Sequence, residues 1–278
     1  SYDTEVIRQG KTFVEKQAIL LTGGDVLGFD AVIGIRKYLI EKGIASPHEV
    51  GKVPNIAGTN IYDIKFCSVE NVNYPDLGYR ACTAASRSAV AQGNVGAGIG
   101  ATVGKFNGLE SAMKGGLGTH VINLPRGISV GALVVVNAVG NVFDLTTGKT
   151  VAGMRNLKKG GFVEFEDYVA EHMTGAGKGT TIGVVATNVV MSHEELLKVA
   201  EMADDGLARS IRPVHMTHDG DTIFTLSTGR CSRPKDVSQH YLVDLVGHHA
   251  SEAVRISILN AVRHAETLNG LIGLASGS

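Results

Sequence analysis

The sequence predicts a layered α+β fold. Segments with strand-like and helix-like patterns are both abundant in the 278 residues, but they do not alternate as regular βαβ units, so a doubly wound parallel sheet is less favoured. Glycine is about twice as frequent as usual, with 36 residues against only 6 prolines, which indicates many tight turns and close backbone approaches. We predict a single domain over residues 1–278.

The first part of the chain carries two expected strands and two expected helices. Residues 18–21 form a short apolar run that ends at a glycine pair, as a buried strand does before a turn. Residues 27–44 have apolar side chains at helical spacing, with a glycine near the expected C-cap. Residues 60–66 are expected as a strand, and the alanine-rich residues 76–91 as a helix.

The middle of the chain opens with the glycine run GNVGAGIGATVGK, residues 93–105, whose backbone has to lie close to other groups. Strands are expected over residues 120–124 and 128–138, and the second is apolar enough to be buried on both faces. The sequence TTGK at residues 146–149 is typical of a hairpin turn. Residues 173–179 are rich in glycine and are expected to form a mobile loop.

The last part of the chain has the clearest pattern. Residues 180–190 are β-branched and predict a strand. Ser192 and Glu195 then have the spacing of a capping box, which predicts a helix to about Arg209. A further strand and a long amphipathic helix complete the chain, over residues 221–227 and 237–265.

Composition and charge exclude several classes of protein. A net charge of −1 and 5% aromatic residues without tryptophan argue against a nucleic-acid partner. No apolar run reaches the roughly 18 residues of a membrane span, and the first residues lack the apolar region of a signal peptide. Cys67, Cys82 and Cys231 form no CxxC pair and are expected in the core. We therefore predict a cytoplasmic protein with no membrane partner.

The glycine run does not fit a nucleotide cofactor. A P-loop ending at Lys105 would need glycine where Ile99 stands and Ser or Thr in place of Phe106. A dinucleotide fingerprint would need a third glycine at Ala101. We expect no cofactor. Lys105 remains a candidate, because a lysine that closes a buried glycine-rich segment is costly unless it is paired or used.

A cluster of histidines and carboxylates has two interpretations. His215, His218, Asp219 and Asp221 lie within seven residues and could bind a divalent metal, although no HExxH pattern is present. A solvated turn before the next strand explains the same residues. We predict no metal, and a metal-dependent hydrolase that uses His215, His218 and Asp221 stays the alternative.

The junction between Gly179 and Thr180 suits self-cleavage, because a glycine-rich loop runs directly into a buried strand there. Cleavage before Thr180 would free its α-amine, whose ordinary pKa of about 7.7–8.0 allows it to act as general base for the threonine hydroxyl.

Four long sequence segments resemble those of a known family. They are GNVGAGIGATVGK, MKGGLGTHVINL, VGALVVVNAVGNVFD and the stretch from TTIGVVATNVV to FTLSTG. From residue 3 to residue 265 the sequence resembles the L-aminopeptidase/D-esterase family, which includes β-peptidyl aminopeptidases and nylon-oligomer hydrolases. The resemblance implies a four-layer αββα sandwich like that of N-terminal-nucleophile hydrolases. It also implies self-cleavage into an α-chain, residues 1–179, and a β-chain, residues 180–278, assembled as a tetramer of αβ units.

The resemblance also implies site residues. Asp219 and Asp221 match a polar pair that is Ser and Glu in the aminopeptidases but Asp and Asp in the nylon-oligomer hydrolases. Gly179 matches the aminopeptidases, whereas the nylon-oligomer hydrolases have Asn before the cleaved bond. The two features indicate different branches.

Three more residues match the family's pocket. Asn137 matches a residue near the oxyanion site, while Lys105 and Tyr62 match pocket residues of the nylon-oligomer branch. Asn137 or Lys105 could donate to an oxyanion, and a carboxylate such as Asp219 could orient the nucleophile. Asn137 could equally satisfy buried strand backbone, and Tyr62 could be core packing.

We predict an autoprocessed N-terminal-threonine amidohydrolase that acts on short peptides as an aminopeptidase. A nylon-oligomer endo-amidase is the alternative among related enzymes. A non-catalytic binding protein that keeps the fold is an alternative of another class, besides the metal-dependent hydrolase.

Overall fold

The computed structural model describes residues 1–11, 15–48, 51–172 and 177–275. Contacts group the chain into two compact units, Ser1–Val90 and Ala91–Ser278, which are described separately. Both combine helices with β-strands, which confirms the predicted mixed α and β content. Residues 173–176 of the predicted mobile loop lie outside the described residues. The single domain and its cleavage into two chains stay predictions.

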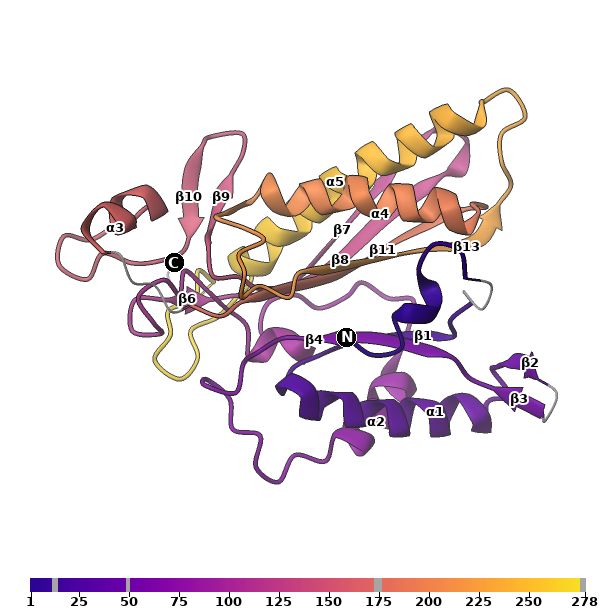
Figure 1. Cartoon of the computed structure of the whole chain (residues 1–278), viewed down its shortest axis with the longest axis horizontal. Coiled ribbons are helices and arrows are strands. Elements are labelled where there is room, and N and C mark those ends of the chain that lie inside the picture. Colours follow the sequence, from indigo (N-terminus) through magenta and orange to yellow (C-terminus); the bar gives the residue numbers. More distant parts are fainter. Residues whose placement is uncertain (12–14, 49–50, 173–176, 276–278) are drawn as a thin grey trace. The chain divides into compact units, whose positions relative to one another are not determined.

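The first unit places two helices beside a small parallel sheet (Figure 1). Its strands are β1 (Ala18–Thr22) and β4 (Ile56–Asn60), and its helices are α1 (Ala31–Glu41) and α2 (Tyr74–Ala84). The remaining elements are the hairpin β2 (Ser46–His48) and β3 (Gly51–Val53) and the 3₁₀ turns η1 (Glu5–Ile7) and η2 (Asp25–Asp30).

The two helices of the first unit pack closely because each carries a glycine at the contact. A β-carbon on Gly34 of α1 would lie 1.8 Å from the carbonyl oxygen of Pro75, and one on Gly78 of α2 would lie 2.1 Å from that of Ala31. Neither distance is sterically possible, so both positions require glycine.

Three sequence predictions in the first unit need correction. The strand expected over residues 60–66 is wrong, since β4 ends at Asn60 and the carbonyl of Asp63 accepts the N–H groups of Phe66 and Cys67 in a turn. The buried Asp63 carboxylate also accepts the N–H of Gly24 at 2.7 Å, which ties this turn to the loop after β1. The helix expected over residues 27–44 begins with a 3₁₀ turn and is α-helical only from Ala31. The helix expected to reach residue 91 ends at Ala84.

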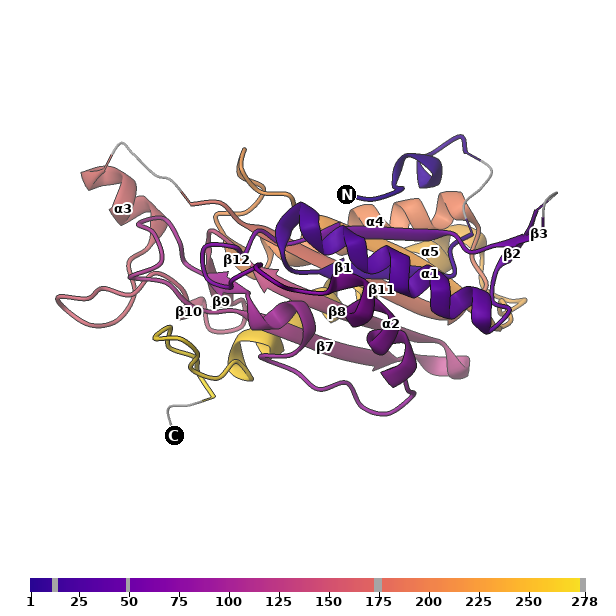
Figure 2. The ribbon, with the colours of Figure 1, turned by 90° about the horizontal axis from the view of Figure 1, so that it is seen from below.

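The second unit is built on a four-stranded mixed sheet in the order β13-β11-β8-β7. These strands are β7 (Gly116–Asn123), β8 (Ser129–Asn137), β11 (Thr180–Val189) and β13 (Thr222–Cys231). Strand β11 is parallel to β13 and antiparallel to β8, which is antiparallel to β7. Helices α4 (His193–Ala208) and α5 (Gln239–Arg263) lie together on one face of this sheet (Figures 1 and 2).

Smaller elements complete the second unit. They are the sheet β10 (Lys149–Ala152), β9 (Asn141–Asp144) and β12 (Ile211–Arg212), the pair β5 (Thr102–Val103) and β6 (Met113–Lys114), the helix α3 (Phe165–Glu171), and the 3₁₀ turns η3 (Gly96–Ile99) and η4 (Pro125–Gly127). The predicted TTGK turn joins β9 to β10. None of the helices in the described part of the chain is long and apolar enough to span a bilayer.

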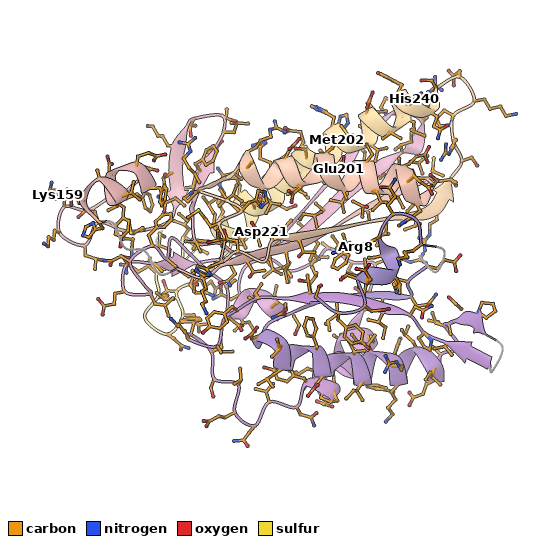
Figure 3. The ribbon with its side chains drawn as sticks, in the orientation of Figure 1. Arg8, Lys159, Glu201, Met202, Asp221 and His240 are labelled. Atoms are coloured by element: carbon orange, nitrogen blue, oxygen red, sulfur yellow. The ribbon has the colours of Figure 1, made fainter. Side chains whose placement is uncertain are left out.

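Glycines bring helix α5 close to the sheet and to helix α4. A β-carbon on Gly118 of β7 would lie 2.0 Å from the carbonyl oxygen of Ser257 on α5. Elsewhere on α5, the sulfur of Met202, which is labelled on α4 in Figure 3, occupies the space beside Gly247. The high glycine content predicted such close approaches, and their positions depend on the packing.

The glycine run at residues 93–105 folds around a buried lysine. The ammonium of Lys114 donates to the carbonyl oxygens of Ile99 and Ala101, each at 2.7 Å, and to that of Gly98 at 3.3 Å. Lys114 is almost fully buried, so these carbonyls replace its water shell. Three backbone carbonyls of the run therefore surround the Lys114 ammonium directly before β5 begins.

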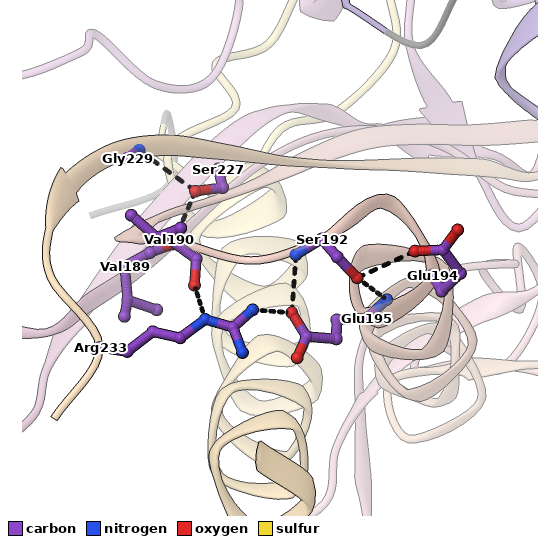
Figure 4. Close-up of polar contacts among 8 residues, drawn as sticks. All are labelled: Val189, Val190, Ser192, Glu194, Glu195, Ser227, Gly229 and Arg233. Atoms are coloured by element: carbon purple, nitrogen blue, oxygen red, sulfur yellow. Dashed lines mark hydrogen bonds and ion pairs between the residues drawn. The ribbon is translucent and has the colours of Figure 1, made fainter. Parts of the chain in front are cut away.

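The capping box predicted after strand β11 is confirmed (Figure 4). The Ser192 N–H donates to the Glu195 carboxylate at 2.6 Å, and the Glu195 N–H donates to the Ser192 hydroxyl at 3.3 Å. Arg233 pairs with the same carboxylate and donates to the carbonyl of Val190 at 2.9 Å. Burial would raise the pKa of Glu195, but the Ser192 N–H and the Arg233 guanidinium outweigh it and lower that pKa.

The three cysteines are half-buried, so the prediction that they lie in the core is wrong: two of them lie at its edge. Cys82 packs on the apolar cluster of α1 and β4, and Cys231 packs on the main cluster of the second unit.

Candidate active site

Thr180 and Asn137 lie opposite each other on two neighbouring strands of the second unit, at one end of the sheet. Thr180 opens β11, Asn137 closes β8, and the antiparallel register makes them direct partners. Both side chains are buried. A cross-strand pair of this kind keeps its side chains within about 5 Å at the β-carbon, so two of the predicted site residues share one place at the end of the sheet.

The Thr180 hydroxyl lies beside the bond predicted to be cut. It donates a hydrogen bond of 2.5 Å to the carbonyl oxygen of Gly179. The backbone N–H of Gly220 donates to the same oxygen at 3.3 Å. A β-carbon on Gly220 would lie 3.3 Å from the Thr180 hydroxyl oxygen, so glycine allows this close approach. The sequence analysis missed Gly220, and its place between two aspartates was the available signal.

Backbone hydrogen bonds hold Lys105 at the site. Its N–H donates to the carbonyl of Val139 at 2.9 Å, and the N–H of Gly104 donates to that of Gly140 at 3.1 Å. Gly104 has φ +72°, and a β-carbon there would lie 2.1 Å from the backbone of Gly153. Lys105 is only 6% exposed. Its ammonium donates to the Asn137 backbone carbonyl at 2.9 Å and to Asn137 Oδ1 at 2.7 Å.

The Asn137 side chain has a defined orientation. Its Oδ1 accepts from the ammonium of Lys105 and also from the Thr102 N–H at 3.0 Å and the Thr102 hydroxyl at 3.2 Å. Three donors on one oxygen identify it as the carbonyl end of the amide, so Nδ2 is the end that can donate. The bond to Thr102 also agrees with the interpretation that Asn137 satisfies buried backbone.

Asp219 lies alongside Gly179 through a parallel bridge. Its Oδ2 accepts the Met216 N–H at 2.9 Å, whereas its Oδ1 is buried and has no hydrogen-bond partner among the described residues. That oxygen would lie 2.9 Å from a β-carbon on Gly179. Burial and the charge of Asp221 raise the pKa of Asp219, and the Met216 N–H and the charge of Lys105 oppose the rise.

Asp221, labelled in Figure 3, anchors the start of β11. Its Oδ1 accepts the Thr181 N–H at 2.6 Å, and its Oδ2 lies 3.0 Å from His215 Nδ1. The other ring nitrogen of His215 lies 3.2 Å from Asp204 on α4. Burial raises the pKa of both Asp221 and Asp204. His215 thus links α4 to the strand that carries Thr180. No sequence signal distinguished Asp204 from its neighbour Asp205.

The remaining predicted residues lie elsewhere. His218 does not join His215 and Asp221 and instead lines a neighbouring cavity. Within the described ranges, no three or more His, Cys, Asp and Glu side chains are grouped to hold a metal ion, so the geometry gives the metal-dependent alternative no support. Tyr62 follows β4 in the first unit, and its role in a pocket stays a prediction.

The comparison with family models decides the family. The model described as peptidase family S58 matches residues 1–275. The chain belongs to peptidase family S58. This S58 peptidase is 34% identical to an uncharacterized aminopeptidase of Mycobacterium leprae over 295 residues, which cover 97% of this chain and 77% of that protein.

One further relative supports the assignment, and one solved structure shares the fold. A 6-aminohexanoate-oligomer endohydrolase of Paenarthrobacter ureafaciens is 32% identical over 228 residues, or 78% of the S58 peptidase and 62% of that protein. The structure of the L-aminopeptidase D-Ala-esterase/amidase of Ochrobactrum anthropi, described as a variant of the Ntn hydrolase fold, superposes with a TM-score of 0.62 and 20% identity, covering 88% and 66% of the two chains. The predicted family resemblance is confirmed, and the family is one of peptidases, which hydrolyse amide bonds.

Proposed function

We propose that this S58 peptidase is an autoprocessed N-terminal-threonine amidohydrolase of the aminopeptidase type. The observation that carries the proposal is the Thr180 hydroxyl, which donates to the Gly179 carbonyl oxygen at 2.5 Å while the Gly220 N–H donates to the same oxygen. A hydroxyl beside a carbonyl that already accepts a backbone donor is the arrangement that acyl transfer requires.

Self-cleavage follows from this geometry in two steps. Thr180 Oγ attacks the carbonyl carbon of Gly179, and the Gly220 N–H stabilises the oxyanion that forms. The bond from that carbon to the Thr180 nitrogen breaks, and the hydroxyl proton ends on the departing nitrogen. Water then hydrolyses the ester, giving its OH to the Gly179 carbonyl and a proton to Thr180 Oγ. The products are a chain of residues 1–179 and a chain of residues 180–278.

Turnover uses the amine that self-cleavage creates. The α-amine of Thr180 takes the hydroxyl proton as Oγ attacks the substrate amide, and it returns a proton to the leaving amine. Water then hydrolyses the ester on Thr180, giving its OH to the acyl carbon and a proton to Oγ. Asn137 Nδ2 and the ammonium of Lys105 are the candidate donors to the substrate oxyanion. Asp219, with its unpartnered buried oxygen next to Gly179, is placed to accept from an ammonium on the acyl part of a substrate.

Short peptides are the proposed substrates. The relative of Mycobacterium leprae, aligned over 97% of this chain, is named an uncharacterized aminopeptidase, and that name supports the exo mode. A nylon-oligomer endo-amidase is the second candidate, because Asp219 and Asp221 match the pair predicted for that branch and a relative of Paenarthrobacter ureafaciens is a 6-aminohexanoate-oligomer endohydrolase.

The proposal includes the arrangement and assembly implied by the family. The four-layer αββα sandwich that the family resemblance implies is part of the proposal. A tetramer of αβ units and a cytoplasmic location belong to the same proposal.

The test starts from the purified protein on a denaturing gel. We expect two bands, with TTIGVVATNV as the N-terminal sequence of one, and hydrolysis of glycine 4-nitroanilide that is insensitive to EDTA. An active chain that is entirely uncut contradicts the proposal. Loss of activity in EDTA with recovery in zinc or manganese would support the metal alternative, and an uncut chain without turnover would support the binding protein.

A further inference from the structure

The space beside Gly179, the residue on the acyl side of the bond that Thr180 attacks, is filled on one side of its α-carbon. Gly179 is buried. A β-carbon added to it would lie 2.5 Å from the backbone nitrogen of Val139, 2.8 Å from the Val139 side chain and 2.9 Å from Asp219 Oδ1. All three distances are well below van der Waals contact, which is about 3.5 Å or more. An L side chain at residue 179 therefore has no room.

The groups that fill this space are held by the fold. Val139 is buried, its carbonyl accepts the Lys105 N–H at 2.9 Å, and it belongs to an apolar cluster with Phe106. The other carboxylate oxygen of Asp219 accepts the Met216 N–H at 2.9 Å. A backbone nitrogen in a packed interior does not move aside as the end of a flexible side chain does. The exclusion of an L side chain at residue 179 is thus a property of the packed site.

The two residues before Gly179 alternate between the site and solvent. Lys178 is exposed. At Gly177 a β-carbon would lie 2.7 Å from the Val139 side chain and 2.9 Å from the carbonyl oxygen of Lys105. Residues 177 and 179 thus face Val139 and residue 178 faces away, as in an extended chain. Of these three positions, only residue 178 has room for a side chain.

A substrate brings its own acyl residue to the same nucleophile. The Thr180 hydroxyl attacks the carbonyl of Gly179 in self-cleavage and the carbonyl of a substrate in turnover. In an aminopeptidase substrate the ammonium is attached to the α-carbon of the acyl residue. The buried Oδ1 of Asp219, which has no hydrogen-bond partner among the described residues, lies next to the α-carbon of Gly179. The same oxygen thus accepts from an ammonium on that carbon and blocks a side chain on it.

We infer that the acyl residue of a substrate takes the place of Gly179, and that this place admits glycine and excludes residues with an L side chain. The inference rests on the proposed attack by Thr180 and names the substrate class of that site, which is short peptides that begin with glycine. Val139 and Asp219 are the residues that determine this specificity.

The 4-nitroanilides of glycine, L-alanine and L-leucine test the inference on the processed enzyme. All three carry the same ammonium and leaving group, so only the side chain differs. We expect kcat/KM for L-alanine to be about 10- to 200-fold below that for glycine, the usual effect of one carbon more than a site is built for. L-Leucine should be cleaved more slowly still. Cleavage of the L-alanine anilide as fast as the glycine anilide would overturn the inference.

Self-cleavage gives a second arm, because Gly179 is itself the acyl residue of that reaction. Gly179→Ala should slow the cut before Thr180, seen as a larger uncut fraction in a time course after synthesis, while circular dichroism shows a folded chain. Lys178→Ala, at the exposed position next to it, is the matched control and should be cut at the wild-type rate. Wild-type cleavage in Gly179→Ala would contradict the closed position.

The outcomes also separate this inference from the proposed function. A cut protein that cleaves L-alanine and glycine anilides equally well would overturn the glycine subsite and leave the proposed function standing. Faster cleavage of 6-aminohexanoic 4-nitroanilide, whose ammonium lies at the far end of its chain, than of glycine anilide would overturn the subsite and support the second candidate function. A cut protein that cleaves no anilide would overturn both the inference and the proposed function.

Discussion

The ammonium of Lys105 donates to both oxygens of Asn137, at 2.9 Å to the backbone carbonyl and 2.7 Å to Oδ1. One buried cation thus fixes the end of strand β8 directly opposite Thr180. This pairing identifies Oδ1 of Asn137 as the accepting end and Nδ2 as the donating end of the amide, and it predicts that the two residues act together.

Asn137→Ala should leave self-cleavage intact and reduce kcat by about 10²–10³, the usual effect of losing one oxyanion donor. Lys105→Met should produce a loss of similar size, and the double variant should lose less than the product of both, because each residue depends on the other. Rates for the two single variants and the double variant on glycine 4-nitroanilide check this. Normal turnover in Asn137→Ala would make it a backbone-satisfying residue and Lys105 the principal donor.

Thr180→Ala should remain a single chain without activity, because no hydroxyl can attack Gly179. The variant should stay folded, since threonine to alanine on a strand costs only about 1 kcal/mol. Thr180→Ser keeps the hydroxyl and should still be cut. Thr181→Ala is the control, because the hydroxyl of Thr181 has no hydrogen-bond partner among the described residues and its loss leaves the Asp221 bond to the Thr181 backbone in place. Intact mass measurements show whether each variant is cut. Cleavage of Thr180→Ala before residue 180 would refute the mechanism.

Asp219→Asn should stabilise the protein while impairing turnover. Burial raises the pKa of Asp219, so the folded protein holds this proton more tightly than the unfolded chain. The free energy of unfolding then falls as the pH rises from the unfolded pKa of about 3.9 through the raised folded pKa. We expect a higher Tm than wild type above that window and a difference that shrinks toward pH 4. Asp205→Asn, on an exposed part of α4, should show neither change.

His215→Ala should slow self-cleavage, because it removes the link from Asp204 to Asp221 and so loosens the anchor of Thr181. We expect the uncut fraction to rise in a time course after synthesis, together with a lower Tm. His215→Gln, which can still donate to one carboxylate, should recover part of the rate. His240→Ala, at an exposed position on α5, is the control. Wild-type cleavage in His215→Ala would remove His215 from the positioning of the nucleophile.

Ser192→Ala should separate stability from function. It removes the acceptor for the Glu195 N–H at the start of α4, and loss of such a cap costs about 1 kcal/mol. Urea unfolding should show that loss with unchanged cleavage before Thr180, since the capping box lies at the opposite end of β11 (Figure 4). Ser192→Thr should restore most of the stability. An equal loss of processing in Ser192→Ala would show that α4 controls the nucleophile.

The sequence by itself determined the elements whose signals are local. The β-branched residues of β11, the capping box at Ser192 and the periodicity of α5 predicted these elements closely, because their patterns depend on neighbours a few residues away. The long strings of residues 93–144 and 180–229 also determined the family.

Only the tertiary structure decided what meets at the site. Lys105 and Asn137 are 32 residues apart in the sequence. Asp204 lies on helix α4 and is linked to Asp221 through the ring of His215. Residues 60–66 had the composition of a strand, yet the burial of Asp63 against Gly24 made them a turn. The place of Gly220 between two aspartates was its only sequence signal, and the register between Gly179 and Asp219 showed that its N–H reaches the Gly179 carbonyl oxygen. Such contacts depend on packing and strand register over long separations, which a local pattern does not encode.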